Sequence, residues 1–316
     1  MTCVWYSLSL GIIYYIKNVC RKYIINTRRK ERFAVIKLKL FVVVALATII
    51  AFGVTATCLA GEQPTGRVFT FTQDDRFTGY RAAIGTEHNR RLGWHFGFNS
   101  SLSLNWSGYA IETNLLAPKN NVAVDVKGTW MVPAVTGPSN GYSAAWVGID
   151  GYASNSVEQI GTEQDWYNGR TTYYAWYEMY PRASRIIPLT VSAGDTISAE
   201  VRYIGNNRFT LMITDSSTGT YSTTQSMPRA KRSSAEWIME APASGRILPL
   251  ANFGTITFNN CYAVLNGYNS NQPGSINYTG WQYDAITMVT SSGIPKATPG
   301  PLYNNGTSFD VVWNHN

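Results

Sequence analysis

The stretch AEWIME, residues 235–240, alternates between two kinds of side chain. Successive side chains of a β-strand point to opposite faces of its sheet, so a strand here has one apolar face and one face that carries carboxylates. The two faces hold, in that order, Trp237 and Met239, and Glu236, Ile238 and Glu240. The stretch therefore predicts a strand that separates a hydrophobic core from a second surface of mixed character.

Two other stretches divide in the same way, AWVGID at residues 145–150 and YAWYEMY at residues 174–180. Their apolar faces, which we expect to lie between two sheets, hold Val147, Ile149, Tyr177 and Met179. Their other faces hold Trp146, Gly148 and Asp150, and Trp176, Glu178 and Tyr180. Large aromatic side chains beside carboxylates favour a groove for an extended ligand. An ordinary polar outer face is the alternative for any single strand.

From residue 104 onward the chain consists of short runs rich in Val, Ile, Thr, Tyr and Trp. Clusters of Gly, Asn, Ser and Pro separate these runs at spacings of about ten residues, which is the pattern of an all-β sandwich or barrel. No helical period of useful length interrupts it. We therefore expect an all-β fold over residues 104–316, an antiparallel β-sandwich of two packed sheets of the concanavalin-like or jelly-roll type.

The N-terminal part has a different composition. Residues 41–60 read FVVVALATIIAFGVTATCLA, without a charge, and they follow Lys37 and Lys39. This pattern is typical of a secretory signal peptide, so we expect residues 1–60 to be a basic leader that directs export. The same stretch is long enough to span a bilayer, so a signal anchor that keeps the protein on the membrane is the alternative. Residues 61–103 show no sustained period and are interpreted as a pro-segment or N-terminal arm.

The formal net charge of +7 comes from the leader. Nine of the 26 Lys and Arg residues lie in the first 60 residues, against Glu31 alone, so the remainder carries a net charge of −1. The body therefore lacks the clustered basic residues that bind a phosphate backbone, and nucleic acid is not expected among its partners. Cys261 is the one cysteine after residue 60, so we expect no internal disulfide in the body and a buried, inert thiol.

All three histidines, His88, His95 and His315, lie outside residues 104–313. A Ser-His-Asp or Cys-His arrangement cannot be built from the residues of this region, which argues against the common hydrolase templates. The region has no zinc ligand set, and its acidic residues are too scattered for a calcium loop, so we expect no metal or other cofactor. Catalysis would then depend on carboxyl, amide and tyrosine groups, and burial among aromatic residues would raise the pKa of the carboxyls.

Five blocks of the sequence occur in an order and spacing that resemble the glutamic peptidases, or eqolisins, a family first known as pepstatin-insensitive acid proteases of fungi. The blocks are Asn105-Trp106-Ser107-Gly108, Ala145-Trp146-Val147-Gly148-Ile149-Asp150, Glu158-Gln159-Ile160-Gly161, Ala175-Trp176-Tyr177-Glu178-Met179-Tyr180-Pro181 and Ala235-Glu236-Trp237-Ile238-Met239-Glu240. The resemblance covers residues 104–265. Any one block is a weak signal, but five in register are specific.

The resemblance implies a β-sandwich with its active site on the concave face of one sheet, in agreement with the alternation argument. It also implies a catalytic pair, Gln159 and Glu240. The positions expected to support the site or to bind substrate are Trp146, Asp150, Glu178, Asp165, Trp106, Trp176, Tyr180 and Glu236. Where fungal members have an Asp soon after Gln-Thr-Gly, this chain is two residues longer, so Glu163 and Asp165 are both candidates for one supporting carboxylate.

The expected function is that of a secreted acid endopeptidase that acts on polypeptides. Glu240 would take a proton from water as the general base, and the amide of Gln159 would donate to the oxyanion. Because a glutamate carboxyl has an ordinary pKa of about 4.3, we expect the rate to peak in acid and to fade toward pH 7.

Two functions of other classes are open alternatives. A glycoside hydrolase on a similar sandwich would use Glu178 and Glu240 as its acid and nucleophile, with Trp146, Trp176 and Tyr180 stacking on sugar rings. A lectin-like module would bind peptide or glycan without turning it over. Gln159 discriminates between the two enzymes, because the peptidase requires this amide and the glycosidase does not.

Overall fold

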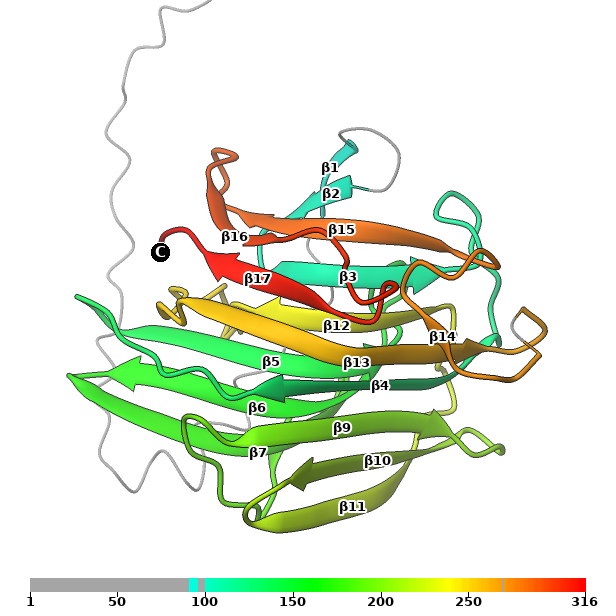
Figure 1. Cartoon of the computed structure of the whole chain (residues 1–316), viewed down its shortest axis with the longest axis horizontal. Coiled ribbons are helices and arrows are strands. Elements are labelled where there is room, and N and C mark those ends of the chain that lie inside the picture. The colour runs from blue at the N-terminus through cyan, green and yellow to red at the C-terminus, as the bar shows by residue number, and fades with distance from the viewer. Residues whose placement is uncertain (1–90, 96–99, 269) are drawn as a thin grey trace, which may run out of the picture. The chain divides into compact units, whose positions relative to one another are not determined.

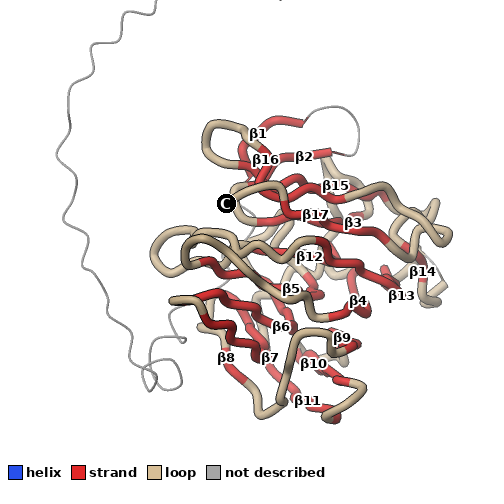
Figure 2. Tube along the Cα trace, turned by 60° about the vertical axis from the view of Figure 1, so that its left-hand side comes forward, coloured by secondary structure: helices blue, strands red, loops and turns tan. Residues whose placement is uncertain are grey.

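The computed structural model describes residues 91–95, 100–268 and 270–316 (Figure 1). They belong to a unit of the chain that extends from Thr70 to Asn316. Figure 2 shows strands joined by loops and turns throughout this described part, which confirms the all-β prediction. The predicted leader, residues 1–60, lies outside the described residues.

The 17 strands of the described residues form one network of hydrogen-bonded neighbours, arranged as two layers. The first layer runs in the order β1 (Arg91–His95), β2 (Ser100–Ser103), β15 (Gln282–Val289), β3 (Trp106–Glu112), β12 (Ser234–Glu240), β5 (Gly141–Ile149), β6 (Val157–Tyr167), β7 (Arg170–Tyr180) and β8 (Arg185–Ile186). The second layer runs in the order β16 (Pro295–Pro299), β17 (Phe309–Trp313), β13 (Thr255–Leu265), β4 (Ala123–Met131), β9 (Thr196–Tyr203), β10 (Arg208–Asp215) and β11 (Gly219–Ser226).

Two further pairings complete the sandwich. The short strand β14 (Gly274–Ser275) pairs with β13, and β15 pairs with β16, which connects the first layer to the second. All strand pairs are antiparallel except β15 with β2, which is parallel. Strand β4 contacts β5 and β12 across the interior, and β9 contacts β5 and β6. The predicted antiparallel β-sandwich is therefore confirmed.

The hydrophobic core lies between the two layers. The six residues that alternation assigned to the interior all belong to one buried cluster: Val147, Ile149, Tyr177, Met179, Trp237 and Met239. Aromatic rings from the second layer join them, with the ring of Phe258 centred 5.7 Å from Trp130 and 5.1 Å from Phe309. A register shift of one residue would have exchanged the faces of each strand, so the assignment of faces is confirmed.

The opposite face of the first layer, which we call the site face, carries a second buried cluster. Its large members are Trp106, Trp146, Tyr152, Trp176, Ile238 and Ile286. Three of them, Trp146, Trp176 and Ile238, are residues that alternation placed on the face away from the core. Each strand in the middle of the first layer is thus covered on both sides, by an apolar core on one and by a mixed cluster on the other.

The sheet begins earlier in the chain than residue 104. Residues Ser100–Ser103 form β2 and pair with β15, and β1 pairs with β2. The hydroxyl of Ser101 donates to a carboxylate oxygen of Asp284 on β15. The residues just before position 104 are therefore part of the first layer, while the proposed processing of residues 61–103 stays a prediction.

Two further findings complete the fold. Cys261 is a free, buried cysteine, and burial raises the pKa of its thiol well above the ordinary value. No helix in the described part of the chain could span a membrane.

Candidate active site

Gln159 and Glu178 are direct neighbours on the site face. Strands β6 and β7 pair so that the two residues lie opposite each other, and Gln159 Nε2 donates to Glu178 Oε2 at 2.9 Å. Their exposed fractions are 0% and 1%. A carboxylate oxygen accepts only from the nitrogen end of an amide, so this bond fixes which way the Gln159 side chain faces.

Glu240 ends strand β12, with Trp106 of β3 opposite it on one side and Ala144 of β5 on the other. Its Oε2 accepts a hydrogen bond from Trp146 Nε1 at 2.8 Å, and its Oε1 accepts one from Asn105 Nδ2 at 3.4 Å. Burial raises the pKa of this carboxyl well above its ordinary value. The hydrogen bond from Trp146 lowers that pKa, and the charge of Glu178 raises it further.

Trp146 is a neighbour of both predicted catalytic residues. Its indole nitrogen donates to Glu240, and its ring meets that of Trp106 edge to face at 4.9 Å. On the other side it lies over Gly148, where an added Cβ would be 2.9 Å from Trp146 Cζ3 and 3.1 Å from Gln159 Cβ. Only a glycine at position 148 leaves this indole and Gln159 in place, so the two predicted catalytic residues share one aromatic neighbour.

A third carboxyl, Glu236, lies on the same face of β12 as Glu240. The strand register places it beside Gly148, which in turn lies opposite Gln159. The side chain is fully buried, and burial raises its pKa well above the ordinary value. Glu236 is therefore in the row of Gln159, while Glu240 occupies a different row of the same sheet.

Asp284 on β15 extends the row of Glu236 toward the edge of the layer. It lies opposite Ala110, which pairs with Glu236 on its other side, and it accepts a hydrogen bond from the Tyr152 hydroxyl at 2.8 Å. Despite these several carboxyls, no group of three or more His, Cys, Asp or Glu side chains that could hold a metal ion occurs among the described residues.

The register separates the two candidates for the supporting carboxylate on β6. Glu163 lies opposite Ala144, the residue that also pairs with Glu240, so Glu163 and Glu240 occupy one row. Asp165 lies opposite Tyr142, two residues further along β6. Both side chains are buried, at 3% and 4% exposure. The geometry favours Glu163 over Asp165 as the carboxyl beside Glu240.

Asp150 lies beyond the end of β5, with a φ of 73°, so the alternation that placed it with Trp146 does not extend to it. It accepts backbone hydrogen bonds from Arg232 at 2.7 Å and Ser233 at 2.9 Å, and a side-chain bond from Ser156 at 3.3 Å. Burial raises its pKa, and the bonds from Ser233 and Arg232 lower it. Its contacts hold the loop before β12 against the end of β5, and its predicted support of the reaction stays a prediction.

The two remaining aromatic candidates lie on β7. Trp176 is buried in the cluster of the site face, opposite Gly161 of β6. Tyr180, the last residue of the strand, is half-buried and packs against the same cluster, opposite Val157. They lie two residues on either side of Glu178, as alternation predicts for one face.

Sequence reasoning did not single out Asn105 and Ser103 as site residues. Asn105 donates to Glu240, and the Ser103 hydroxyl donates to Asn105 Oδ1 at 3.1 Å. The same hydroxyl accepts from the backbone N–H groups of Asn105 at 3.3 Å and Trp106 at 3.1 Å. Asn105 did stand in one of the five blocks, and its position directly before a strand that pairs with β12 was the available signal.

The chain is similar to known proteins of one family. Residues 104–298 match the Peptidase A4 family. Aspergillopepsin-2 from Aspergillus niger is 29% identical over 196 residues, which cover 54% of this chain and 67% of that protein. Scytalidopepsin B from Scytalidium lignicola is 32% identical over 157 residues, which cover 45% of this chain and 59% of that protein, less than two thirds of its length.

A solved structure of scytalido-glutamic peptidase with a peptide-based transition-state analogue has a similar fold. It is 25% identical to this chain, with a TM-score of 0.54, and the likeness covers 66% of this chain and 98% of that one. The family match covers well over half of the chain and contains all five blocks. The chain therefore belongs to the Peptidase A4 family and is a hydrolase of the glutamic peptidase class.

Proposed function

We propose that the chain is an exported acid endopeptidase in which Gln159 and Glu240 activate a water molecule for attack on a peptide bond. One observation carries the proposal. Strands β6, β5 and β12 bring Gln159, Trp146 and Glu240 to one buried face, where the Trp146 indole donates to Glu240 and lies near Gln159. Membership of the Peptidase A4 family favours this function over the glycoside hydrolase and the lectin-like module.

Glu240 is the proposed general base. A peptide bond resists neutral water, so the site must remove a proton from the attacking water molecule. The N–H donors of Trp146 and Asn105 hold the two carboxylate oxygens of Glu240 and stabilise its ionised form. Once protonated, the same carboxyl would give its proton to the leaving nitrogen, which returns Glu240 to the ionised form.

Gln159 is the proposed electrophilic partner. Its amide nitrogen carries two hydrogens, one of which is donated to Glu178. In the proposal, the second N–H donates to the oxyanion of the tetrahedral intermediate, and the amide oxygen accepts from the attacking water. Glu178 would thus act through Gln159, as the group that orients the amide before the substrate arrives.

The ionisation of Glu240 sets the acid side of the pH profile. Burial and the charge of Glu178 both raise the pKa of Glu240. A general base must be ionised to take a proton from water, so we infer that the rate rises with pH as Glu240 ionises. The raised pKa moves this rise to a higher pH than for an ordinary glutamate, and the fall of the rate toward neutral pH stays a prediction from the sequence.

Export is the part of the proposal that rests on sequence alone. Its support is the uncharged stretch at residues 41–60 after a basic segment. N-terminal sequencing of protein collected outside the cell would test it, and material that begins at Met1 would favour the membrane anchor instead.

The test of the reaction is cleavage of a denatured protein substrate by the full chain between pH 2 and pH 8. We expect a maximum in acid, no loss of rate with a chelator or with serine- and thiol-directed reagents, and a loss of about 10²-fold or more in kcat for Glu240→Gln. Glu236→Gln is the matched variant, because it makes the same change at an equally buried position of the same strand and face. A folded Glu240→Gln protein that keeps most of its activity while Glu236→Gln loses it would overturn the assignment.

A further inference from the structure

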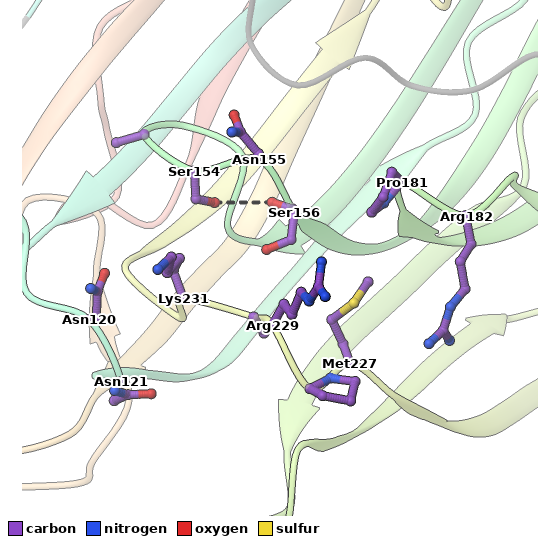
Figure 3. Close-up of a pocket in the computed structure, with 13 residues that line it drawn as sticks. Asn120, Asn121, Ser154, Asn155, Ser156, Pro181, Arg182, Met227, Arg229 and Lys231 are labelled. Carbon is purple, nitrogen blue, oxygen red and sulfur yellow. Dashed lines mark hydrogen bonds between the residues drawn. The ribbon is translucent and has the colours of Figure 1, made fainter.

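A cleft of about 960 Å³ opens where β6 begins and β7 ends (Figure 3). Four separate segments line it: the loop before β4, the loop between β5 and β6, the residues after β7, and the loop before β12. The cleft therefore lies where β6 begins and β7 ends, near Gln159 and Glu178, and at the start of β12, whose other end carries Glu240. None of these three residues lines it.

The lining of this cleft is cationic. It contains Arg182, Arg229 and Lys231 and no Asp or Glu. Figure 3 shows the Arg229 side chain extending between Ser156 and Pro181, with Lys231 and Arg182 on either side of it. All three cationic side chains are exposed, and among the described residues none of them forms an ion pair.

Arg232 lies in the same loop, but its side chain, unlike those of the three cleft cations, has partners within the fold. Its guanidinium lies 3.8 Å from the centre of the Tyr203 ring and donates to the carbonyl oxygen of Ala123 at 3.3 Å. Its backbone N–H donates to Asp150. Arg232 has partners within the fold, whereas the three cleft cations have no carboxylate partner among the described residues, so their charges are open to solvent and to a ligand.

The distance to the proposed reaction centre suits a polypeptide substrate. Ser156, on the cleft wall, lies three residues before Gln159 in the chain, and Arg182 lies four residues after Glu178. At about 3.4 Å per residue along a strand, the cleft begins about 10 Å from the row of Gln159. An extended substrate has the same rise per residue, so its third or fourth residue from the scissile bond would reach the cleft.

We propose that this cleft is a substrate subsite in which Arg182, Arg229 and Lys231 bind a carboxylate side chain of the polypeptide, about three residues from the scissile bond. The proposal rests on the proposed peptidase function and names its substrate class, polypeptides with an Asp or Glu at that distance. Two guanidinium groups and one ammonium group suit a carboxylate, because arginine pairs with it in a bidentate manner and lysine adds a mobile charge.

The charges of the cleft and of the substrate carboxyl determine how the preference for an acidic substrate residue depends on pH. Arg and Lys side chains are ordinarily protonated throughout the acid range, so the cleft keeps its charge wherever the enzyme is active. A substrate aspartate has an ordinary pKa of about 3.9 and loses its charge below that pH. The preference should therefore be present at pH 5 and largely absent at pH 3.

The experiment compares kcat/KM for peptide pairs that differ only in Asp or Asn, placed at each position from two to four residues on either side of the scissile bond. At one of these positions we expect the Asp peptide to be cleaved about two- to fivefold better than the Asn peptide at pH 5. We expect this ratio to fall toward one at pH 3. An Asp-to-Asn ratio near one at every position and both pH values would overturn the proposal.

The variants assign the preference to the cleft. In the triple variant Arg182→Gln, Arg229→Gln, Lys231→Gln, the ratio at pH 5 should fall toward one. The matched control replaces three exposed arginines that do not line the cleft, Arg170→Gln, Arg208→Gln and Arg246→Gln, with the same change in net charge, and it should keep the wild-type ratio. A ratio that survives in the cleft variant, or disappears equally in both, would overturn the proposal.

A second readout separates this proposal from the proposed function. If the wild-type chain cleaves neither peptide, the peptidase function fails, and the cleft is then tested by equilibrium binding of the same labelled peptides to the Glu240→Gln chain at pH 5. Tighter binding of the Asp peptide that is lost in the cleft variant supports the subsite. Equal binding of the two peptides overturns it.

Discussion

The two faces of strand β12 are equally buried and chemically opposite. Trp237 and Met239 point into the core between the layers, and Glu236 and Glu240 point to the site face, all four with an exposed fraction of 0%. Burial of the first pair stabilises the fold through the hydrophobic effect. Burial of the second pair costs free energy, because it removes water from the carboxyls, and it raises the pKa of both well above the ordinary value.

Because both faces of β12 are buried and only one of them is apolar, burial alone does not identify a hydrophobic core. A face that holds buried carboxyls, an amide and indoles is maintained against its own desolvation cost. We therefore expect substitutions on the core face to change mainly the stability of the fold, and substitutions on the site face to change mainly the catalytic rate.

The largest expected effect is on the core face. Met239→Ala removes a fully buried side chain and should lower the free energy of unfolding by about 2–5 kcal/mol. Met239→Leu keeps the volume and should cost less than about 1.5 kcal/mol. Urea denaturation measures both, and the comparison fails if the two variants are equally stable.

On the site face, Gln159→Ala should lower kcat by about 10²- to 10³-fold, because it removes the proposed oxyanion donor. The fold should remain, since the strand itself is held by β5 and β7 on either side. Steady-state kinetics at the acid optimum and a urea denaturation curve test the two statements together. A variant that loses its fold as readily as Met239→Ala would place Gln159 among structural residues instead.

Asp150 lies beyond the end of β5 and holds the loop before β12, so its substitution should affect stability. Asp150→Asn replaces a carboxylate oxygen by an NH₂ group that faces N–H donors from Arg232 and Ser233, which should cost about 1–3 kcal/mol of stability. Asp195→Asn, at a turn where the carboxylate accepts from Ser192, is the control and should cost less because water can replace its partner. Equal losses in the two variants would argue against a structural role for Asp150.

The smallest expected effect is a dependence of stability on pH. Burial raises the folded-state pKa of Glu236 above the unfolded value of about 4.3, so the native state binds more protons than the unfolded state between these two values. The stabilisation is present below the unfolded pKa and is lost as the pH rises through the folded pKa, by up to about 1.4 kcal/mol per pH unit for one group.

Denaturation of the wild type and of Glu236→Gln at several pH values checks this dependence. We expect the wild type to lose stability as the pH rises above about 4.3 and the variant to lose less. Parallel curves for the two proteins would show that Glu236 does not titrate in this window.

The faces of the strands could be read from the sequence because alternation is a local rule. It placed Val147 and Trp237 in the core and Trp146 and Glu178 on the site face without knowledge of any neighbour. It failed at Asp150, where the φ of 73° ends the strand. A single left-handed residue interrupts the alternation, and nothing in the six letters AWVGID marks that change.

The contacts between distant segments could not be read in this way. Asn105 meets Glu240 across 135 positions of sequence, and that contact depends on the register between β3 and β12. The same holds for Glu163, which the pairing through Ala144 places in the row of Glu240. The cationic cleft requires four loops to converge, so its three cations appear in the sequence only as scattered residues.

We propose that Gln159 and Glu240 act as one catalytic unit on the site face. A double-mutant cycle of kcat at the acid optimum tests this, with the wild type, Gln159→Ala, Glu240→Gln and the double variant, each shown to be folded. We expect the double variant to be no slower than the slower single variant, because either change alone already disables the unit. A double variant whose loss equals the product of the two single losses would show that the two residues act independently, contrary to this proposal.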